Sequence, residues 1–555
     1  MSNTSEKTSS GEWKFVGVVT VAVLVITSLP YAFAVLSAPP ERYFTGFILN
    51  VSDHTQYLSW YKAFQTQYLI ANRLTSEPNP PLFFNLLWWL LGRFGRYSGL
   101  NYIAVYQIFR WLAGAFFMVM VYGLASEIFP TVSKRRTAFL VILLGSGLGW
   151  ILVVMKYTVT GGKLLFPLVV YVAEGNSFLS VLGYPHFAEA AGLILAVFWL
   201  LLVGERTGKL RYAVYAGLVA VWLGWQHTYD LLIVWGIPAA YAAVLWLLDR
   251  RWPSYWFKAL VIVGLLSWPP ALYAGLLTRL NPMWEEVLAQ FANAGVYTPS
   301  LPLLLVFMGV PLMVALVTFA LRLRDTVTRR GAGQSVTRKE LFIGVWFIAG
   351  LALTYVPTDF QIHMINSWQV PVGLLATTGL FDYMLPALSR RRQPSQLSSK
   401  LALVFIMLVV PTNIYLLLWR FVDLNRHNYP FYLYRDEVSA MEWLESHAPP
   451  ESIVFSALDD GQFIPGLSGQ RAFLAHWAQT VNFFAKRDLV KGFFGEDTDD
   501  GRRRQILRQY EVGYVLYGPA EQALGEYVPD GSSFLQLAFS TPRVKVYRVS
   551  VTDDN

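Results

Sequence analysis

The stretch HFAEAAGLILAVFWLLLVGERTGKLR, residues 186–211, contains an apolar run over 186–204 and then a basic cluster at Arg206, Lys209 and Arg211. An apolar run of this length, in a helix that rises about 1.5 Å per residue, covers a hydrocarbon core of about 30 Å. Basic residues just beyond such a run are typical of the cytoplasmic end of a transmembrane helix. The stretch therefore predicts a membrane-spanning helix.

Similar runs recur along the chain, and the composition agrees with them. Of the 555 residues, 55% are hydrophobic and only 14% are charged, and the mean hydropathy is +0.41. Soluble domains carry about 25% charged residues, so the fold class is an α-helical polytopic membrane protein. We expect about eleven spans, near 15–37, 102–126, 137–156, 186–204, 212–226, 231–248, 259–278, 301–321, 341–356, 367–386 and 401–419.

The basic residues alternate with these spans. They gather in five loops, at 134–136, 206–211, 250–258, 322–339 and 390–400. Because positive residues stay on the cytoplasmic side, these loops and the N-terminus should face the cytoplasm of a multi-pass protein in the cell membrane. The loop 38–101 and everything after Arg420 should then be extracytoplasmic. Since the basic residues lie between apolar segments rather than on one soluble face, we expect no nucleic acid partner.

The tail has a different composition from the rest. Residues 431–555 carry a net charge of −6, against +14 for the first 430 residues. Strand patterns at 452–456, 512–517 and 543–549 and a helical pattern at 437–447 predict a soluble α/β domain. We therefore expect a transmembrane domain over 1–425 and an extracytoplasmic domain over 426–555. The segments 459–466 and 475–480 are expected to form turns or to cap an acceptor groove. Without cysteine, the chain has no disulfide and no thiolate site.

The first outer loop, 38–101, is long enough to suggest a functional role. Asp53 lies just beyond the first span, in the setting Asp53-His54-Thr55-Gln56-Tyr57, and the alternative is a solvated loop residue or an N-cap before a helix at 55–67. Asn79-Pro80-Pro81-Leu82-Phe83 then leads into an apolar segment, 82–92, which is too short to span and should be a short helix at the outer leaflet.

This layout resembles the membrane glycosyltransferases of the GT-C superfamily, in particular the dolichyl-phosphate-mannose-protein mannosyltransferase type. The matching features are Asp53 and Tyr57, the Pro-Pro-Leu entry, Gly95 and Arg110, in that order along residues 40–130. The rest of the chain matches only by topology and by its C-terminal domain. The family often has Asp-Glu where this chain has Asp53-His54, which puts a two-carboxylate metal site in doubt.

The resemblance implies a GT-C-like bundle and an inverting transfer of sugar from a polyprenyl-phosphate donor to a hydroxyl of a glycan, lipid or protein acceptor on the outer face. Such an enzyme would serve a cell envelope glycan. Asp53 would be the catalytic base, and His54 and Tyr57 would bind substrate. A divalent cation is left open as a cofactor.

Further polar residues at the outer ends of the spans are candidates for substrate binding. They are Glu174, His186, Glu189, His227, Asp230 and His363. Ionisable groups at this depth are costly and therefore often functional, although a capping or structural role is about as common for His186 and Glu189. The outer basic residues that could reach a lipid phosphate are Lys62, Arg73 and Arg279, while the alternative for each is an interfacial residue whose charge extends to the water. Arg110, inside a span, could instead bridge helices.

Two other classes of function remain open. Transporters and lipid flippases place ionisable residues near the middle of the membrane in paired repeats, and this chain has no evident repeat. A non-catalytic assembly protein could keep the fold without the activity, and turnover of a labelled lipid-linked sugar would separate it from an enzyme.

Overall fold

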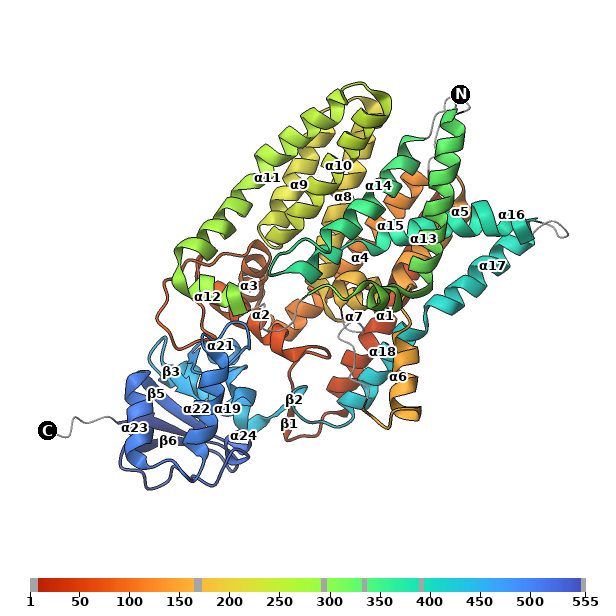
Figure 1. Cartoon of the computed structure of the whole chain (residues 1–555). Coiled ribbons are helices and arrows are strands. Elements are labelled where there is room, and N and C mark those ends of the chain that lie inside the picture. Colours follow the sequence, from red (N-terminus) through yellow and green to blue (C-terminus); the bar gives the residue numbers. More distant parts are fainter. Residues whose placement is uncertain (1–7, 164–171, 291–296, 332–336, 389–393, 551–555) are drawn as a thin grey trace. The chain divides into compact units, whose positions relative to one another are not determined.

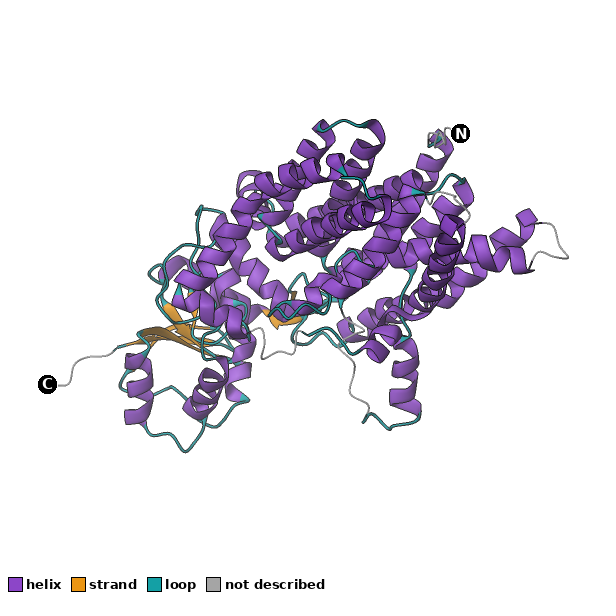
Figure 2. Ribbon diagram, turned by 45° about the horizontal axis from the view of Figure 1, so that its top comes forward, coloured by secondary structure: helices purple, strands orange, loops and turns teal. Residues whose placement is uncertain are grey.

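The computed structural model describes residues 8–163, 172–290, 297–331, 337–388 and 394–550. Helices make up most of the chain, and the strands are confined to two small sheets (Figures 1 and 2). Two compact units can be distinguished. Unit 1 contains residues 1–29, 108–272 and 296–419, and unit 2 contains 30–107, 273–295 and 420–555. The first outer loop thus belongs to the same unit as the tail.

Unit 1 is a helical bundle in which α8 (Pro185–Thr207), α9 (Arg211–Gly224) and α10 (Leu231–Asp249) lie side by side (Figure 1). Its long apolar helices include parts of α1 (Ser10–Ser37), α4 (Tyr102–Ile128) and α11 (Ser254–Leu280), which continue into unit 2. The others are α5 (Val132–Leu144), α6 (Gly149–Thr158), α7 (Ser177–Gly183), α8 (Pro185–Thr207), α9 (Arg211–Gly224), α10 (Leu231–Asp249), α13 (Leu301–Gly331), α14 (Arg338–Leu353), α15 (Gln369–Thr378), α16 (Leu385–Leu388), α17 (Pro394–Val409) and α18 (Pro411–Leu424), the last of which also continues into unit 2.

Helices occupy all eleven ranges in which the sequence predicts spans, so the polytopic helical fold is confirmed. Within the described residues, eight helical segments are long and apolar enough to cross a membrane, or nine if the bent pair α17–α18 is one span. The helices α9 and α14 fall short, with 14 and 16 residues. A 14-residue helix is about 21 Å long, less than the roughly 30 Å of a hydrocarbon core. The lengths of these two helices therefore do not support the full number of eleven membrane spans.

Several helices of unit 1 are broken where glycine or proline occurs. The chain leaves helical geometry between α5 and α6, within α13 at Gly309 (φ 61°), and before Pro411, where α17 and α18 meet at 46°. Gly147 lies so close to α13 that a Cβ atom there would be 1.9 Å from the carbonyl oxygen of Phe307. Only glycine allows that approach of two backbones, so this residue fixes how the break packs.

Arg110 bridges helices, which is one of the two roles predicted for it from the sequence. It is fully buried, and its guanidinium donates to the Thr27 hydroxyl at 2.9 Å, to the Ser28 hydroxyl at 2.5 Å and to the Val181 carbonyl at 3.4 Å. These partners belong to α1 and α7. A buried guanidinium needs several acceptors to offset its lost hydration, and this arrangement supplies them.

Unit 2 contains the predicted α/β fold. Its five-stranded sheet, orange in Figure 2, has the order β4-β3-β5-β7-β6. In this sheet β3 is parallel to β4 and β5, and β7 is antiparallel to β5 and β6. Three predicted strands and the predicted helix are present. The strands are β1 (Arg42–Phe44), β2 (Tyr432–Tyr434), β3 (Ile453–Phe455), β4 (Arg471–Ala472), β5 (Val512–Tyr517), β6 (Leu535–Ser540) and β7 (Lys545–Val549).

The helices of unit 2 lie in the first outer loop and around the sheet. They are α2 (Val51–Phe64), α3 (Leu86–Ser98), α12 (Pro282–Gln290), α19 (Arg435–His447), α20 (Leu458–Gly461), α21 (Ile464–Leu467), α22 (Phe483–Phe494), α23 (Asp500–Gln509) and α24 (Pro519–Gln522). The short helix expected at 82–92 is α3, displaced by a few residues because Asn85 caps it by accepting from the Trp88 N–H.

β1 pairs with β2, so the start of the first outer loop forms a sheet with the start of the tail. The predicted domain boundary near 425 stays a prediction, as does the orientation in the membrane. Of the basic residues used to orient the chain, Arg390, Arg391 and Arg392 lie outside the described residues.

Candidate functional site

Asp53 lies in the first turn of α2, because that helix begins earlier than the sequence suggested. Asn50 is its N-cap, with the left-handed backbone conformation (φ 36°, ψ 58°) that asparagine tolerates better than most residues. The Asn50 side-chain amide donates to Asp53 Oδ2. Asp53 is therefore not itself the N-cap of a helix at 55–67. A carboxylate in the first turn is favoured by the partial positive charge of the helix N-terminus.

The other oxygen of Asp53 contacts a residue that is distant in the sequence. His476 Nε2 lies 3.0 Å from Asp53 Oδ1, and the two residues are 423 positions apart. The His476 side chain is only 2% exposed, whereas the Asp53 side chain is 35% exposed. The pair thus consists of a buried imidazole and a carboxylate that keeps access to solvent.

The surroundings of Asp53 favour its ionised form. Burial by itself raises the pKa of the Asp53 carboxyl, but the hydrogen bond from His476, together with His54 and Asn50, outweighs burial and holds the pKa below its ordinary value. At neutral pH the carboxylate is therefore available to accept a proton or a hydrogen bond.

The segment that carries His476 is fastened to the first outer loop by hydrogen bonds. The Thr480 hydroxyl donates to the Leu74 carbonyl at 2.6 Å, and the Asn72 amide donates to the Gln479 carbonyl at 2.9 Å. The Val481 N–H donates to the Thr75 hydroxyl at 3.1 Å. All of these groups are buried, so they stabilise one geometry of the two segments.

Lys486, on α22, adds a charged contact between the tail and the first outer loop. Its ammonium group lies 2.7 Å from both Ser76 Oγ and Glu77 Oε2, and its side chain is 1% exposed. Burial lowers the pKa of Lys486, while Glu77 opposes that effect. A buried ammonium left without its carboxylate would be strongly disfavoured, which makes Glu77 and Lys486 a structural pair.

Two further residues of α2 that the sequence predicts to bind substrate, His54 and Tyr57, both follow Asp53 in the sequence. His54 is buried, with Nδ1 3.0 Å from the Asn50 carbonyl and Nε2 2.9 Å from the Tyr106 hydroxyl, so both ring nitrogens are used within the fold. Tyr57, one turn after Asp53, is half-buried and stacks on Trp88 at 4.8 Å and 7° between ring planes. Tyr57 is therefore more accessible to a ligand than His54 is.

The predicted phosphate-binding residues of unit 2 differ in their surroundings. Lys62 forms an ion pair with Glu445 at 2.6 Å, and Arg73 binds Glu451 through both Nε and Nη2. These carboxylates already neutralise the two cations. Arg279, at the end of α11, is exposed. Their roles in binding phosphate stay predictions.

Unit 1 brings five of the six remaining candidates together. His227 Nδ1 lies 3.3 Å from Asp230 Oδ2, and the same carboxylate oxygen accepts from the Asn366 amide at 2.9 Å. The ring of His186 is 5.5 Å from that of His227. His363 pairs with Glu174.

Aromatic rings connect these two groups of unit 1. The Phe187 ring contacts both His227, at 5.2 Å, and His363, at 6.0 Å, and Tyr229 stacks on His363 at 4.8 Å. We call the set Glu174, His186, His227, Asp230 and His363 the histidine cluster. Three imidazoles and two carboxylates offer donors and acceptors for a polar ligand.

Glu189 lies apart from the histidine cluster. It is on the same face of α8 as His186, as the spacing predicts, but its carboxylate accepts from the Trp222 indole at 3.0 Å on α9. In this position it links two helices.

Two buried acidic side chains, Asp460 in the tail segment 459–466 and Glu521, lie in the segments after β3 and β5. Glu521 accepts from the Ala457 and Gly518 N–H groups at 2.6 and 2.7 Å, and Asp460 is 1% exposed. Burial raises the pKa of Glu521 to about 7 and that of Asp460 well above its ordinary range. The contact between Glu521 and Ala457 links the segments that follow β3 and β5. Within 459–466 the chain forms the short helices α20 and α21 rather than turns alone, and the capping role stays a prediction.

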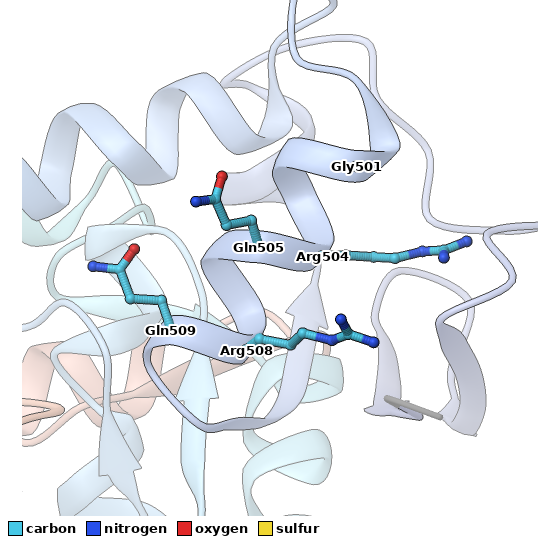
Figure 3. A pocket seen from close by; sticks show the side chains of 5 residues that line it. All are labelled: Gly501, Arg504, Gln505, Arg508 and Gln509. Carbon is cyan, nitrogen blue, oxygen red and sulfur yellow. The ribbon is translucent and has the colours of Figure 1, made fainter. Parts of the chain in front are cut away.

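A surface hollow in unit 2 is separate from all of these groups. It is a shallow depression along α23, lined by Gly501, Arg504, Gln505, Arg508 and Gln509 (Figure 3). None of the predicted site residues lines it. Among the described residues, no group of three or more His, Asp or Glu side chains is placed so that it could hold a metal ion.

Sequence reasoning missed His476 and Lys486. The segment 475–480 was noted for its polar residues, but no local pattern connects it with Asp53. For Lys486 the sequence gives only a weak signal. A lysine on the apolar face of an amphipathic helix implies a carboxylate partner, but the sequence does not show which carboxylate that is.

The fold resembles those of two kinds of solved transferase. The Archaeoglobus fulgidus oligosaccharyltransferase in the apo form matches with a TM-score of 0.52 and 13% identity, covering 96% of this chain and 75% of that one. The arabinofuranosyltransferase AftD from Mycobacteria matches with a TM-score of 0.55 and 12% identity, covering 99% of this chain and 40% of that one.

A structure of the same oligosaccharyltransferase in complex with zinc and sulfate matches with a TM-score of 0.51 and 14% identity, over 95% of this chain and 72% of that one. No protein-family model and no curated protein matches the sequence. At these identities the likeness concerns the fold.

Proposed function

We propose that this chain, which has the GT-C fold of membrane glycosyltransferases, transfers a sugar from a polyprenyl-phosphate donor to an acceptor hydroxyl. The observation that carries the proposal is Asp53. It is an ionised, partly exposed carboxylate at the start of the first helix after a membrane span, held by His476 and Asn50. Solved structures of this fold include an oligosaccharyltransferase and an arabinofuranosyltransferase, which supports sugar transfer.

In this reaction Asp53 is the base. The acceptor oxygen bonds to the anomeric carbon of the sugar as the bond from that carbon to the phosphate oxygen breaks. The hydroxyl proton passes to the Asp53 carboxylate, and the lipid phosphate leaves with the electron pair of the broken bond. Because the acceptor attacks from the side opposite the phosphate, the configuration at the anomeric carbon inverts.

The leaving phosphate needs positive charge or hydrogen-bond donors. In the same unit as Asp53, Arg279 supplies an exposed guanidinium. We assign Arg279 to the donor headgroup, and the predicted role of the histidine cluster in substrate binding is a separate proposal about unit 1. Tyr57, beside Asp53 on α2 and stacked on Trp88, is assigned to the sugar or acceptor, since aromatic rings pack against the apolar faces of sugars.

A divalent cation was left open by the sequence, and a solved structure of this fold holds zinc. The described side chains do not form a metal site of three or more ligands. Following the basic loops, we place the protein in the cell membrane with its C-terminal domain outside.

A transfer assay tests the proposed function. Membranes with the full chain are given polyprenyl phosphates that carry labelled hexoses or pentoses, each in turn. We expect the label to leave the lipid and to appear on an acceptor, with release of polyprenyl phosphate, only when the chain is present. If the label crossed the membrane while still attached to its lipid, the chain would be a translocator and the proposal would be wrong.

A further inference from the structure

The His476 ring is held by two hydrogen bonds, one in which a ring nitrogen accepts and one in which the other ring nitrogen donates. Its Nδ1 accepts from the backbone N–H of Ala478 at 3.1 Å, and its Nε2 faces Asp53 Oδ1 at 3.0 Å. A backbone N–H can only donate, so Nδ1 carries no proton. The ring proton is then on Nε2, which donates it to Asp53. His476 is therefore a neutral imidazole in one fixed tautomer.

His54 shows that this arrangement is specific to His476. The Nδ1 of His54 faces the Asn50 carbonyl, which can only accept, so His54 carries a proton on Nδ1. Its Nε2 faces the Tyr106 hydroxyl rather than Asp53. Thus the titratable groups that act on the Asp53 carboxylate are His476, by direct contact, and His54, by its charge alone.

We propose that His476 is a positioning residue for sugar transfer: its Nε2–H holds Asp53 Oδ1, so that the remaining lone pairs of the carboxylate face the acceptor hydroxyl. This inference rests on the proposed function. A carboxylate has about four acceptor positions, of which His476 and Asn50 occupy two. His476 keeps its own proton throughout, and the proton of the acceptor goes to Asp53.

The C-terminal domain becomes part of the active site in this way. His476 is held by its own turn, in which the Ala475 N–H donates to the Thr480 hydroxyl at 3.0 Å, and the same hydroxyl donates to the Leu74 carbonyl. A catalytic group must be held within about half an ångström of its working geometry, and a buried turn with satisfied hydrogen bonds does this.

The test compares His476→Ala with His476→Gln in the full chain. The Gln side-chain amide can place an N–H near the position of Nε2, whereas Ala cannot. A hydrogen bond to a charged group contributes enough that its loss should lower kcat by roughly 10- to 100-fold in His476→Ala. His476→Gln should recover most of that loss. His447→Ala, which removes an exposed histidine of α19, is the matched control and should keep wild-type kcat.

The pH profile distinguishes positioning from a purely structural role. Transfer requires ionised Asp53, so the rate falls as the pH drops through the pKa of Asp53. Since the His476 hydrogen bond lowers that pKa, its removal should shift the acid limb of kcat/KM to higher pH in His476→Ala. His476→Gln should keep the wild-type limb.

If His476→Ala loses activity only in proportion to its folded fraction, with the acid limb unmoved, the inference is overturned. The same holds if His476→Gln is as slow as His476→Ala. Absence of transfer in the wild-type protein would instead refute the proposed function, so the two failures are distinguishable.

Discussion

Asp53→Asn should lower the rate of sugar transfer by roughly 100-fold or more. The substitution keeps the size of the side chain but removes its affinity for a proton. The Asn oxygen can still accept from His476 Nε2, so the contact with the tail is kept. The acceptor hydroxyl would then lose its base while donor binding persists. Initial rates with a labelled polyprenyl-phosphate sugar measure the effect.

Two controls accompany this variant. Its melting temperature in detergent and its binding of the donor should match those of the wild-type protein. Asp436→Asn, which alters a carboxylate of α19 that pairs with Arg543, controls for the loss of a negative charge elsewhere in the unit. Near wild-type transfer by Asp53→Asn would show that another group takes the proton.

Asp230→Ala should weaken use of the donor by roughly tenfold or more while most of the protein stays folded. The Asp230 carboxylate is fully buried and accepts from Asn366 at 2.9 Å. It also lies 3.3 Å from His227, for which we keep the predicted role in substrate binding. Removing the carboxylate releases both partners, which costs about 1–3 kcal/mol of stability for buried polar groups. The expected signature is a raised KM for the donor with a modest fall in melting temperature.

Asp249→Ala is the matched control, since Asp249 is at the opposite end of α10 and pairs with Arg338 at 2.8 Å. It should leave the KM for the donor unchanged. Melting temperature and transfer rate are measured on the same preparations. If Asp230→Ala lowers stability and the activity per folded molecule is normal, then Asp230 is a structural residue and its assignment to the donor site is wrong.

The fold could be predicted because its signals are local. Apolar runs such as 186–204 and the alternation of basic loops do not depend on distant contacts, and helices occur in every predicted range. The lengths of the helices were harder to predict. The helix α9 ends at Gly224, and the 3₁₀ turn Thr228–Asp230 follows shortly after it, so the end of the apolar run does not mark the end of the helix. Strands at 453–455, 512–517 and 545–549 were found by their β-branched and aromatic residues.

The site could be predicted only in part, because its contacts are long-range. Asp53 and Tyr57 share a helix, so their motif was visible in the sequence. The contact between Asp53 and His476 joins residues 423 apart and follows from how the tail packs on the first outer loop. In the histidine cluster, His227 and Asp230 were paired by spacing, but the pairing of His363 with Glu174 had no sequence signal.

The configuration of the newly formed glycosidic bond tests the central claim most directly. Purified protein is incubated with a polyprenyl-phosphate sugar of known anomeric configuration and with an acceptor found in the transfer assay, and the product is analysed by NMR. We predict a new glycosidic bond of inverted configuration, formed together with free polyprenyl phosphate. Retention of configuration, or consumption of the donor without a new glycosidic bond, would contradict direct attack by an acceptor activated at Asp53.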